Sequence, residues 1–505
     1  MVELLDAVAA AVRRLEQPGV EVTTHRGLVS QVADGRTVSV VVPHEYYVLA
    51  APEPESLRAG VVGFGVEHPG SAEFETSALH ASQLAALLEI SPTSVAELER
   101  RGIAATHFPL GYVPEWDRWH RRSAVRDVDV VYLGSADPRR MGILSGAAAA
   151  LAGLRNELVI TPHEQVTGLR PDFLAGTDKW ELLARSKVLV NLHRGEKTAL
   201  EWVRVLEAVL NGCVVVTEPS DDLGPLVPGE HVVVAAPGEV GAEAAALVRD
   251  DRRRARLAEA AYDLVRGLDL AQPAALLLQM CERITPTPAA TNPPVTAPEP
   301  LHHPAVWLPA PGGGPPAPPE LAPVRLRARP APTADTRLAL LCTGPGRDGR
   351  AGATVQSAER WAVPVHVWNG ATHAHRGAER NRLLEATDEP LVAILDSGDE
   401  LLDDTLLAMA DLLRSDPGLD AVLCPATYGG TLVNVVRPDA ERLRRRVYLT
   451  RGYVVRRAAL EAMGGFTEEP ALADLVDHHF WLSLAAGGGR TGVVRRIGLA
   501  LRPEQ

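Results

Sequence analysis

The sequence predicts an α/β protein with at least two folded domains, and three observations lead to this prediction. The chain has 505 residues, whereas a single hydrophobic core stops growing at about 250 to 300 residues. Short apolar runs alternate with helix-like patterns, which is typical of parallel sheets with crossover helices. A tract from 286 to 332 holds sixteen of the forty prolines and interrupts this alternation, because proline sustains neither helix nor ladder hydrogen bonds.

Composition and charge exclude several classes of protein. Apolar residues make up 46% of the chain and charged residues 23%, as in globular proteins. The net charge of -13 is spread out, and no basic stripe with interleaved aromatics occurs, so nucleic acid is not the expected partner. No stretch of about 18 apolar residues is present, so we expect no integral membrane segment. The first nineteen residues predict an amphipathic helix rather than a signal peptide, and we expect a cytoplasmic protein.

Two smaller compositional features agree with that expectation. The cysteines are far apart in the sequence, which predicts buried free thiols rather than a disulfide framework or a zinc site. Their positions are Cys213, Cys281, Cys342 and Cys424. Heavy use of Ala, Arg, Gly and Pro with few Lys suggests a high-GC bacterial gene.

The pattern of apolar runs divides the chain into four segments. We expect two α/β domains at 1–122 and 123–284, an extended proline-rich linker at 285–334, and a smaller α/β domain at 335–505. In the first two domains the expected strands are 37–42, 60–64, 129–133, 157–160, 188–192, 213–217 and 231–234, and the expected helices include 92–101, 178–186, 199–210 and 242–264. In the last domain the expected strands are 338–342, 363–367, 391–395 and 421–424, and the expected helices are 377–386, 403–414 and 457–463.

The segment from Val188 to Ala236 carries the first motif, VLVNLHRGEKTALEWVRVLEAVLNGCVVVTEPSDDLGPLVPGEHVVVAA. It consists of a strand, a loop, a helix with a late glutamate, an Asn-Gly turn and a strand that ends in Thr-Glu-Pro. With the earlier DVDVVYLGSADPRR, it resembles the nucleotide-sugar-binding domain of GT-B-fold glycosyltransferases of the family 1 and 4 type, especially the spore-protein-like bacterial group. The resemblance implies two Rossmann-like domains, the first on the acceptor side.

Ligands of open parallel sheets bind where the strands end and helices begin, and a diphosphate needs cationic donors and exposed N–H groups. We therefore expect donor binding by His193, Arg194 and Lys197. The resemblance adds Glu207 as the glutamate that holds the ribose hydroxyls, with a surface ion-pair row formed with Arg204 as the alternative.

Three further predictions concern the same half. Retaining members of the family carry a glutamate where this chain has Ala199, so either Glu201 is the catalytic replacement or this half lacks that function. Ser135, in the turn after a strand, is a candidate phosphate donor or a plain turn serine. Glu67 and His68 follow another strand and form a candidate acid/base pair. No cofactor is firmly implied for this half.

The segments AERNRLLEATDEPLVAILDSGDELLDD, YLTRGYVVRRAALEAMGGF and DHHFWLSLAAGG carry the second set of motifs. In this order they resemble family-2, GT-A-fold glycosyltransferases, and the resemblance implies a partly reduced GT-A-like domain. Strand-end carboxylates of that family hold a divalent cation, Mg²⁺ or Mn²⁺, that neutralises the departing phosphates. Asp396 and Asp399 are the candidate ligands, with Asp396 also assigned to donor binding, and Gly398 stands where the family has its second carboxylate.

The resemblance also assigns Asp477 as the general base that takes the proton of the acceptor hydroxyl, with a helix N-cap as the alternative role. The acidic residue expected after the second strand is replaced by Asn369. The glycines of LALLCTGPGRDG have a dinucleotide-loop spacing, but the following strand lacks the required acid and Pro345 removes an N–H, which argues against a nicotinamide site.

Together these patterns predict a glycosyltransferase that moves a sugar from a nucleotide-sugar donor to a hydroxyl acceptor, which we expect to be a glycan or glycoconjugate of the cell surface. The alternative is a non-catalytic scaffold that binds glycan or nucleotide, with one or both halves degenerate. Transfer of sugar by the separated halves distinguishes the two, since a scaffold binds donor without consuming it.

Overall fold

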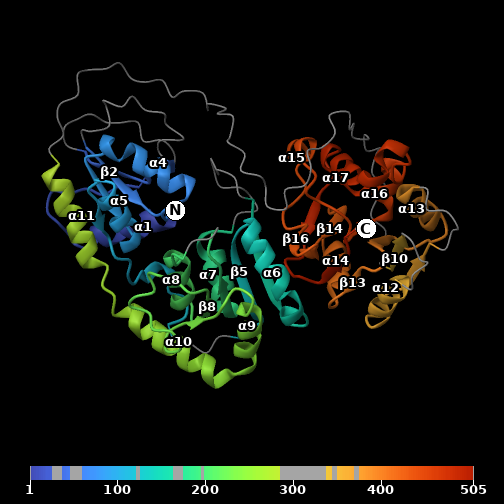
Figure 1. Cartoon of the computed structure of the whole chain (residues 1–505), viewed down its shortest axis with the longest axis horizontal. Helices are drawn as coiled ribbons and strands as arrows, with labels where there is room; N and C mark the ends of the chain where they lie inside the picture. Colours follow the sequence, from blue (N-terminus) through green and yellow to red (C-terminus); the bar gives the residue numbers. More distant parts are fainter. Residues whose placement is uncertain are drawn as a thin grey trace, which may run out of the picture. The chain divides into compact units, whose positions relative to one another are not determined.

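The computed structural model describes residues 2–24, 37–45, 60–120, 125–162, 174–194, 198–284, 337–343, 350–368 and 375–503 (Figure 1). The chain forms two compact units. The first comprises Met1–Asp127, Gln165–Ala236 and Leu247–Trp307, and the second comprises Val128–Glu164, Pro237–Ala246 and Leu308–Gln505. This division differs from the four predicted segments, whose boundaries remain predictions.

The N-terminal sheet has four parallel strands in the order β1-β2-β3-β4. Its strands are β1 (Ser39–Val41), β2 (Val61–Gly65), β3 (Ala86–Glu89) and β4 (Thr106–His107), and its helices are α1 (Val2–Arg13), α4 (Ala72–His80) and α5 (Pro92–Arg100). All five residues of β2 are buried. The amphipathic helix predicted at the N-terminus is α1, whereas β3 and β4 were not predicted, because runs of two to four residues give no readable period.

A second sheet has five strands in the order β6-β5-β7-β8-β9, and the pairs β5–β6, β7–β8 and β8–β9 are parallel. The strands are β5 (Val128–Ser135), β6 (Asn156–Thr161), β7 (Ser186–Asn191), β8 (Val214–Thr217) and β9 (Val233–Val234). The helices are α6 (Pro138–Leu151), α7 (Gly176–Arg185), α8 (Trp202–Leu210), α9 (Val240–Arg249), α10 (Asp251–Arg266) and α11 (Ala271–Arg283). All five strands lie where the apolar runs predicted them.

The single helix predicted for 242–264 is wrong, because two helices occupy that range. The side chain of Asp250 accepts a hydrogen bond from the backbone N–H of Arg253 at 2.9 Å. Asp250 is therefore the N-cap of α10 and separates it from α9, as expected for an aspartate that competes with the helix for backbone donors.

In the C-terminal half, a six-stranded mixed sheet has the order β11-β10-β12-β17-β14-β18 and a four-stranded sheet has the order β13-β19-β15-β16. The strands are β10 (Leu338–Thr343), β11 (Val365–Val367), β12 (Leu391–Asp396), β13 (Glu400–Leu401), β14 (Ala421–Leu423), β15 (Ala426–Tyr428), β16 (Thr431–Val433), β17 (Tyr453–Arg456), β18 (Thr491–Val493) and β19 (Leu499–Leu501). The helices are α12 (Arg350–Glu359), α13 (Arg376–Glu385), α14 (Thr405–Ser415), α15 (Ala440–Arg445), α16 (Arg457–Met463) and α17 (Val476–Ala486).

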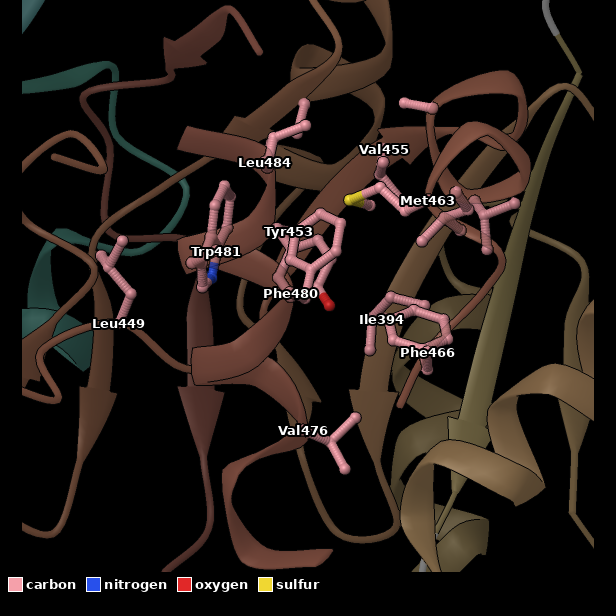
Figure 2. Close-up of a cluster of buried hydrophobic side chains, with 14 of the residues drawn as sticks. Ile394, Leu449, Tyr453, Val455, Met463, Phe466, Val476, Phe480, Trp481 and Leu484 are labelled. Atoms are coloured by element: carbon pink, nitrogen blue, oxygen red, sulfur yellow. The ribbon is translucent and has the colours of Figure 1, made fainter. Parts of the chain in front are cut away.

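Strand β17 is antiparallel to both of its neighbours, β12 and β14. Its Tyr453 and Val455 belong to one hydrophobic cluster and its Val454 to another, because successive side chains of a strand point to opposite faces. In the first cluster the ring of Tyr453 stacks on Phe480, with centroids 4.6 Å apart, and Trp481 meets it edge-on (Figure 2). This packing fixes α17 against the sheet.

No helix among the described residues is long and apolar enough to cross a membrane. The four cysteines are free. Burial is confirmed for Cys213, Cys342 and Cys424, whereas Cys281 is only partly buried.

Candidate functional site

The carboxyl ends of the N-terminal strands gather several ionisable side chains. His44 follows β1, Glu67 follows β2 and Glu89 ends β3, and in a parallel sheet these ends share one edge. The Nε2 atom of His44 lies 4.0 Å from Oε1 of Glu67. Sequence analysis found Glu67 here but missed His44 and Glu89, although the position of Glu89 at the end of an apolar run was a usable signal.

Glu89 is 1% exposed. Burial, together with the nearby charge of Glu67, raises the pKa of Glu89 to about 8. Burial also lowers the pKa of His44 to about 4, so the imidazole is neutral at physiological pH. Titratable groups whose environments separate their pKa values are suited to acid/base work, and here a protonated carboxyl stands beside the second glutamate.

Arg194 belongs to the loop after β7 and reaches these N-terminal residues. One guanidinium nitrogen lies 2.8 Å from Oε1 of Glu73, on α4, and another lies 3.8 Å from Oε2 of Glu67. The predicted donor-binding arginine is thus beside the predicted acid/base residue Glu67. The structure therefore brings together two candidates that the sequence treated separately.

His193 is buried at the end of β7. Its backbone N–H donates to Glu218 at 2.8 Å, and its Nε2 lies 2.8 Å from the hydroxyl of Ser220. Both partners follow β8, so the ends of two adjacent parallel strands are joined. Lys197, predicted beside His193, lies outside the described residues.

Asp222 fixes the entry to α8 and was missed by sequence analysis. Its carboxylate accepts the backbone N–H of Leu200 at 2.6 Å and the hydroxyl of Ser91 at 3.2 Å, and its carbonyl accepts the indole N–H of Trp202 at 3.0 Å. Ser91 is the N-cap of α5. Asp222 therefore links the strand-end loops of the first sheet to those of the second within the first unit.

Glu207 is 3% exposed and makes its contacts through Oε1. Nζ of Lys179 lies 2.6 Å from this atom, and the indole N–H of Trp180 donates to it at 3.1 Å. Burial raises the pKa of Glu207, although Lys179 opposes the shift. The ion-pair partner is thus Lys179 on α7 rather than Arg204, while Arg204 lies 3.7 Å from Glu201 at the N-cap of α8.

Ser135, in the second unit, ends β5, and its hydroxyl accepts a hydrogen bond from Arg140 at 3.0 Å. Arg140 is 2% exposed and lies in the first turn of α6, after the N-cap Asp137. A guanidinium at a helix N-terminus is a donor set suited to an anion. Sequence analysis named the serine and missed the arginine.

The predicted acids of the C-terminal half lie together. Asp396 ends β12, Asp477 lies in the first turn of α17, and both carboxylates contact Arg380 on α13, which is fully buried. Arg380 Nη1 is 2.7 Å from Asp477 Oδ1, and its Nη2 is 3.3 Å from Asp396 Oδ1. The hydroxyl of Tyr453 also donates to Asp477, at 3.1 Å.

Asp399 is paired with a second buried arginine. Arg451 approaches its two oxygens at 2.6 and 2.9 Å and Oδ2 of Asp396 at 3.2 Å. Arg376 lies 3.3 Å from the same Oδ2. Burial acts to raise the pKa of Asp396, but the three arginines outweigh it and hold that pKa well below its ordinary value.

A divalent cation does not fit this arrangement. Hard cations need several carboxylate or carbonyl oxygens that are available for coordination, and here arginine donors occupy those oxygens. Among the described residues, no group of three or more His, Cys, Asp and Glu side chains is placed to hold a metal ion. The glycines of the dinucleotide-like loop, Gly344, Gly346 and Gly349, lie outside the described residues.

Comparison with known families shows what the central part of the chain resembles. Residues 142–277 match the family described as Glycosyl transferase-like. The chain therefore contains a domain that is similar to this family. This domain runs from within α6 to within α11 and includes His193, Arg194, Glu201 and Glu207, whereas Ser135 precedes it. No curated protein matches the sequence.

Solved structures that are similar to this chain share little of its sequence. TarS 1-349 of S. aureus in complex with UDP-GlcNAc is 14% identical over 34% of this chain and 59% of that chain, with a TM-score of 0.27. A UDP-forming trehalose-phosphate synthase from Burkholderia xenovorans is 12% identical over 45% and 69%, with a TM-score of 0.31. Anabaena HepE in complex with UDP-glucose is 16% identical over 43% and 72%, with a TM-score of 0.33. The chain thus spans about three-fifths of the TarS structure.

Proposed function

We propose that the protein transfers a sugar from a nucleotide-sugar donor to a hydroxyl group of a glycan or glycoconjugate acceptor. The observation that carries this proposal is the glycosyl transferase-like match of residues 142–277, which includes the strand-end loop with His193 and Arg194. That loop supplies a cation and buried polar groups where ligands of parallel sheets bind.

The two sheets of the N-terminal half support a GT-B-like pair of Rossmann-like domains, with the first on the acceptor side. In this proposal His193, Arg194, Lys197 and Glu207 bind the donor, and Glu201 takes the place of the family's earlier glutamate. Arg194 exchanges its contact with Glu73 for the diphosphate. This exchange costs little, since both partners are anions and the guanidinium stays hydrogen-bonded.

Acid/base chemistry in this half is proposed for the strand-end glutamates. Glu67 accepts the proton of the attacking hydroxyl, and Glu89 keeps its own proton throughout. Charge favours this assignment: with Glu89 neutral at pH 7, Glu67 avoids a second anion beside it and can remain ionised.

For the C-terminal half we propose a GT-A-like domain. Its support is the sheet order β11-β10-β12-β17-β14-β18, with β17 antiparallel between β12 and β14, and the three family-2-like motifs. The resemblance assigns Asp477 as a base in this half, but both of its oxygens receive Arg380 and one also receives Tyr453, so it is not proposed as the base. A cytoplasmic, bacterial setting is part of the same proposal.

The test incubates the full chain with a panel of nucleotide sugars and measures release of the nucleoside diphosphate, with and without acceptor glycans. We expect release from at least one donor, increased by an acceptor. A protein that binds a donor tightly but releases no nucleoside diphosphate supports the scaffold instead. A protein that neither binds nor consumes any donor contradicts both the glycosyltransferase and the scaffold.

A further inference from the structure

The carboxylates that would hold a divalent cation in the C-terminal half are already saturated with hydrogen-bond donors. A carboxylate oxygen offers two lone-pair directions. Oδ1 of Asp396 receives Thr343 and Arg380, at 2.7 and 3.3 Å. Oδ2 of Asp396 lies 3.2 Å from Arg451 and 3.3 Å from Arg376.

The two oxygens of Asp399 are equally occupied. Oδ1 receives Nη2 of Arg451 at 2.9 Å and the backbone N–H of Arg502 at 2.8 Å. Oδ2 receives Nε of Arg451 at 2.6 Å and the backbone N–H of Asp396 at 2.8 Å. Both oxygens of Asp477 also receive Arg380, and one receives Tyr453 in addition.

The charge balance of the cluster also argues against a bound divalent cation. Three carboxylates face three guanidiniums, so the cluster is neutral without a metal ion. Arg380, Arg451 and Asp399 are at most 2% exposed. A dication placed among them would have to displace an arginine and leave it buried without its partner, which is costly.

The backbone adds an independent observation at the position where family-2 enzymes carry the second acidic ligand. Gly398 has φ of 97°, in a region that favours glycine, and its N–H donates to the hydroxyl of Thr354 at 2.9 Å. An aspartate at 398 would be strained. The turn is therefore built for glycine, and the loss of this ligand is part of the fold.

We propose that these arginines are permanent internal counter-ions that take the place of a divalent cation. The Asp396–Asp399–Asp477 cluster is then a structural ionic network in a metal-independent module. It joins the end of β12, the start of β17, helices α13 and α17 and the segment after β19. Resting on the proposed function, this inference assigns the sugar transfer to the N-terminal half.

The first test titrates Mn²⁺ into the full chain and follows its electron paramagnetic resonance signal. The test variant is Asp396→Asn. The matched control is Asp388→Asn, because Asp388 is an exposed acid that pairs with Arg337. We expect wild type and both variants to give the same titration. One Mn²⁺ per chain that is lost in Asp396→Asn and kept in Asp388→Asn overturns the proposal.

The second test measures thermal unfolding. Arg451→Met leaves Asp399 buried without its guanidinium partner and removes one of the three arginines around Asp396, so we expect the Tm to fall by roughly 10 °C. Arg490→Met, which removes an exposed pair with Asp416, is expected to change it by no more than about 2 °C. If Arg451→Met yields no folded protein, Arg451→Lys gives the graded case, with a loss larger than that of Arg490→Met. An unchanged Tm in either Arg451 variant contradicts the network.

These measurements do not use sugar transfer as a readout. Stoichiometric Mn²⁺ binding at Asp396 would remove the inference and leave the proposed function standing. Absence of any nucleotide-sugar turnover would remove the proposed function and leave the ionic network standing.

Discussion

At the scale of single residues, buried ionisable groups decide both the chemistry and the stability of this protein. Glu89 is buried near the charge of Glu67, and both effects raise its pKa, to about 8. Glu207 is buried against Lys179 at 2.6 Å. Glu89 therefore keeps its proton to a higher pH than an ordinary glutamate, whereas Glu207 depends on Lys179 as its counter-ion.

The raised pKa of Glu89 makes stability depend on pH. Between the ordinary value of 4.5 and about 8, the folded state holds a proton that the unfolded state releases, so the free energy of unfolding falls as pH rises through this window. Glu89→Gln removes this dependence. Between pH 5 and pH 8 we expect the free energy of unfolding of the variant to rise by about 4 kcal/mol relative to that of wild type, measured by urea unfolding.

Glu99→Gln, an exposed change on α5, is the control for Glu89→Gln, and its difference from wild type is expected to be the same at both pH values. Parallel pH profiles for wild type and Glu89→Gln would show that Glu89 is not protonated in the fold.

Loss of Lys179 is expected to be costly, because it leaves the carboxylate of Glu207 buried without its counter-ion. Lys179→Met should lower the free energy of unfolding by about 3 kcal/mol, measured by urea denaturation. The double variant Lys179→Met with Glu207→Gln should recover a large part of the loss. The control is Arg185→Met, because Arg185 lies on the same helix as Lys179 and forms an exposed ion pair with Asp127. Loss of this exposed pair should cost at most about 1 kcal/mol. An equal cost for the two single variants would argue against the buried pair.

At the scale of elements, helix α8 shows how the loops at both of its ends are fixed. Asp222 and Ser91 hold its entry. At its exit, Gly212 has φ of 66°, and the guanidinium of Arg126 donates to the carbonyl of Asn211 at 2.9 Å. The Asn-Gly pair seen in the sequence is thus a helix end packed against aromatic and cationic groups.

A Cβ atom at 212 would lie 2.4 Å from the ring of Trp119 and 2.5 Å from Arg126. Gly212→Ala therefore combines an unfavourable φ with overpacking, and we expect it to cost about 2 to 4 kcal/mol of unfolding free energy. Gly229→Ala is the matched change, because its φ is 80° and open space surrounds its Cβ position. It should cost only about 1 kcal/mol. Chemical denaturation of both variants checks this, and equal losses would mean that the contact with Trp119 is absent.

At the scale of the whole molecule, the sequence predicted the class of the fold and most of the central strands, because β5 to β8, β10 and β12 each contain an apolar run. It did not predict β17, a four-residue strand whose place between β12 and β14 depends on antiparallel pairing with segments far along the chain. Period and propensity carry no information about such pairing.

The candidate site was predictable to a similar extent. Strand ends pointed to His193, Arg194 and Asp396, and the family-2 resemblance pointed to Asp477. The structure places these residues in two clusters. Their partners were not predictable, since Arg380 and Asp477 are 97 positions apart and Lys179 precedes Glu207 on a different helix. Whether an acid binds metal, protein or substrate depends on these partners.

The most direct test of the central claim measures the affinity of the full chain for a nucleotide-sugar donor identified in the panel, using isothermal titration calorimetry, in wild type and Arg194→Met. If the strand-end loop of the glycosyl transferase-like domain binds the diphosphate, loss of one charged hydrogen bond should raise the Kd by about 10- to 100-fold. The control Arg100→Met, which removes an exposed arginine paired with Glu97, should leave the Kd unchanged. A donor that binds equally well to wild type and Arg194→Met would contradict the account.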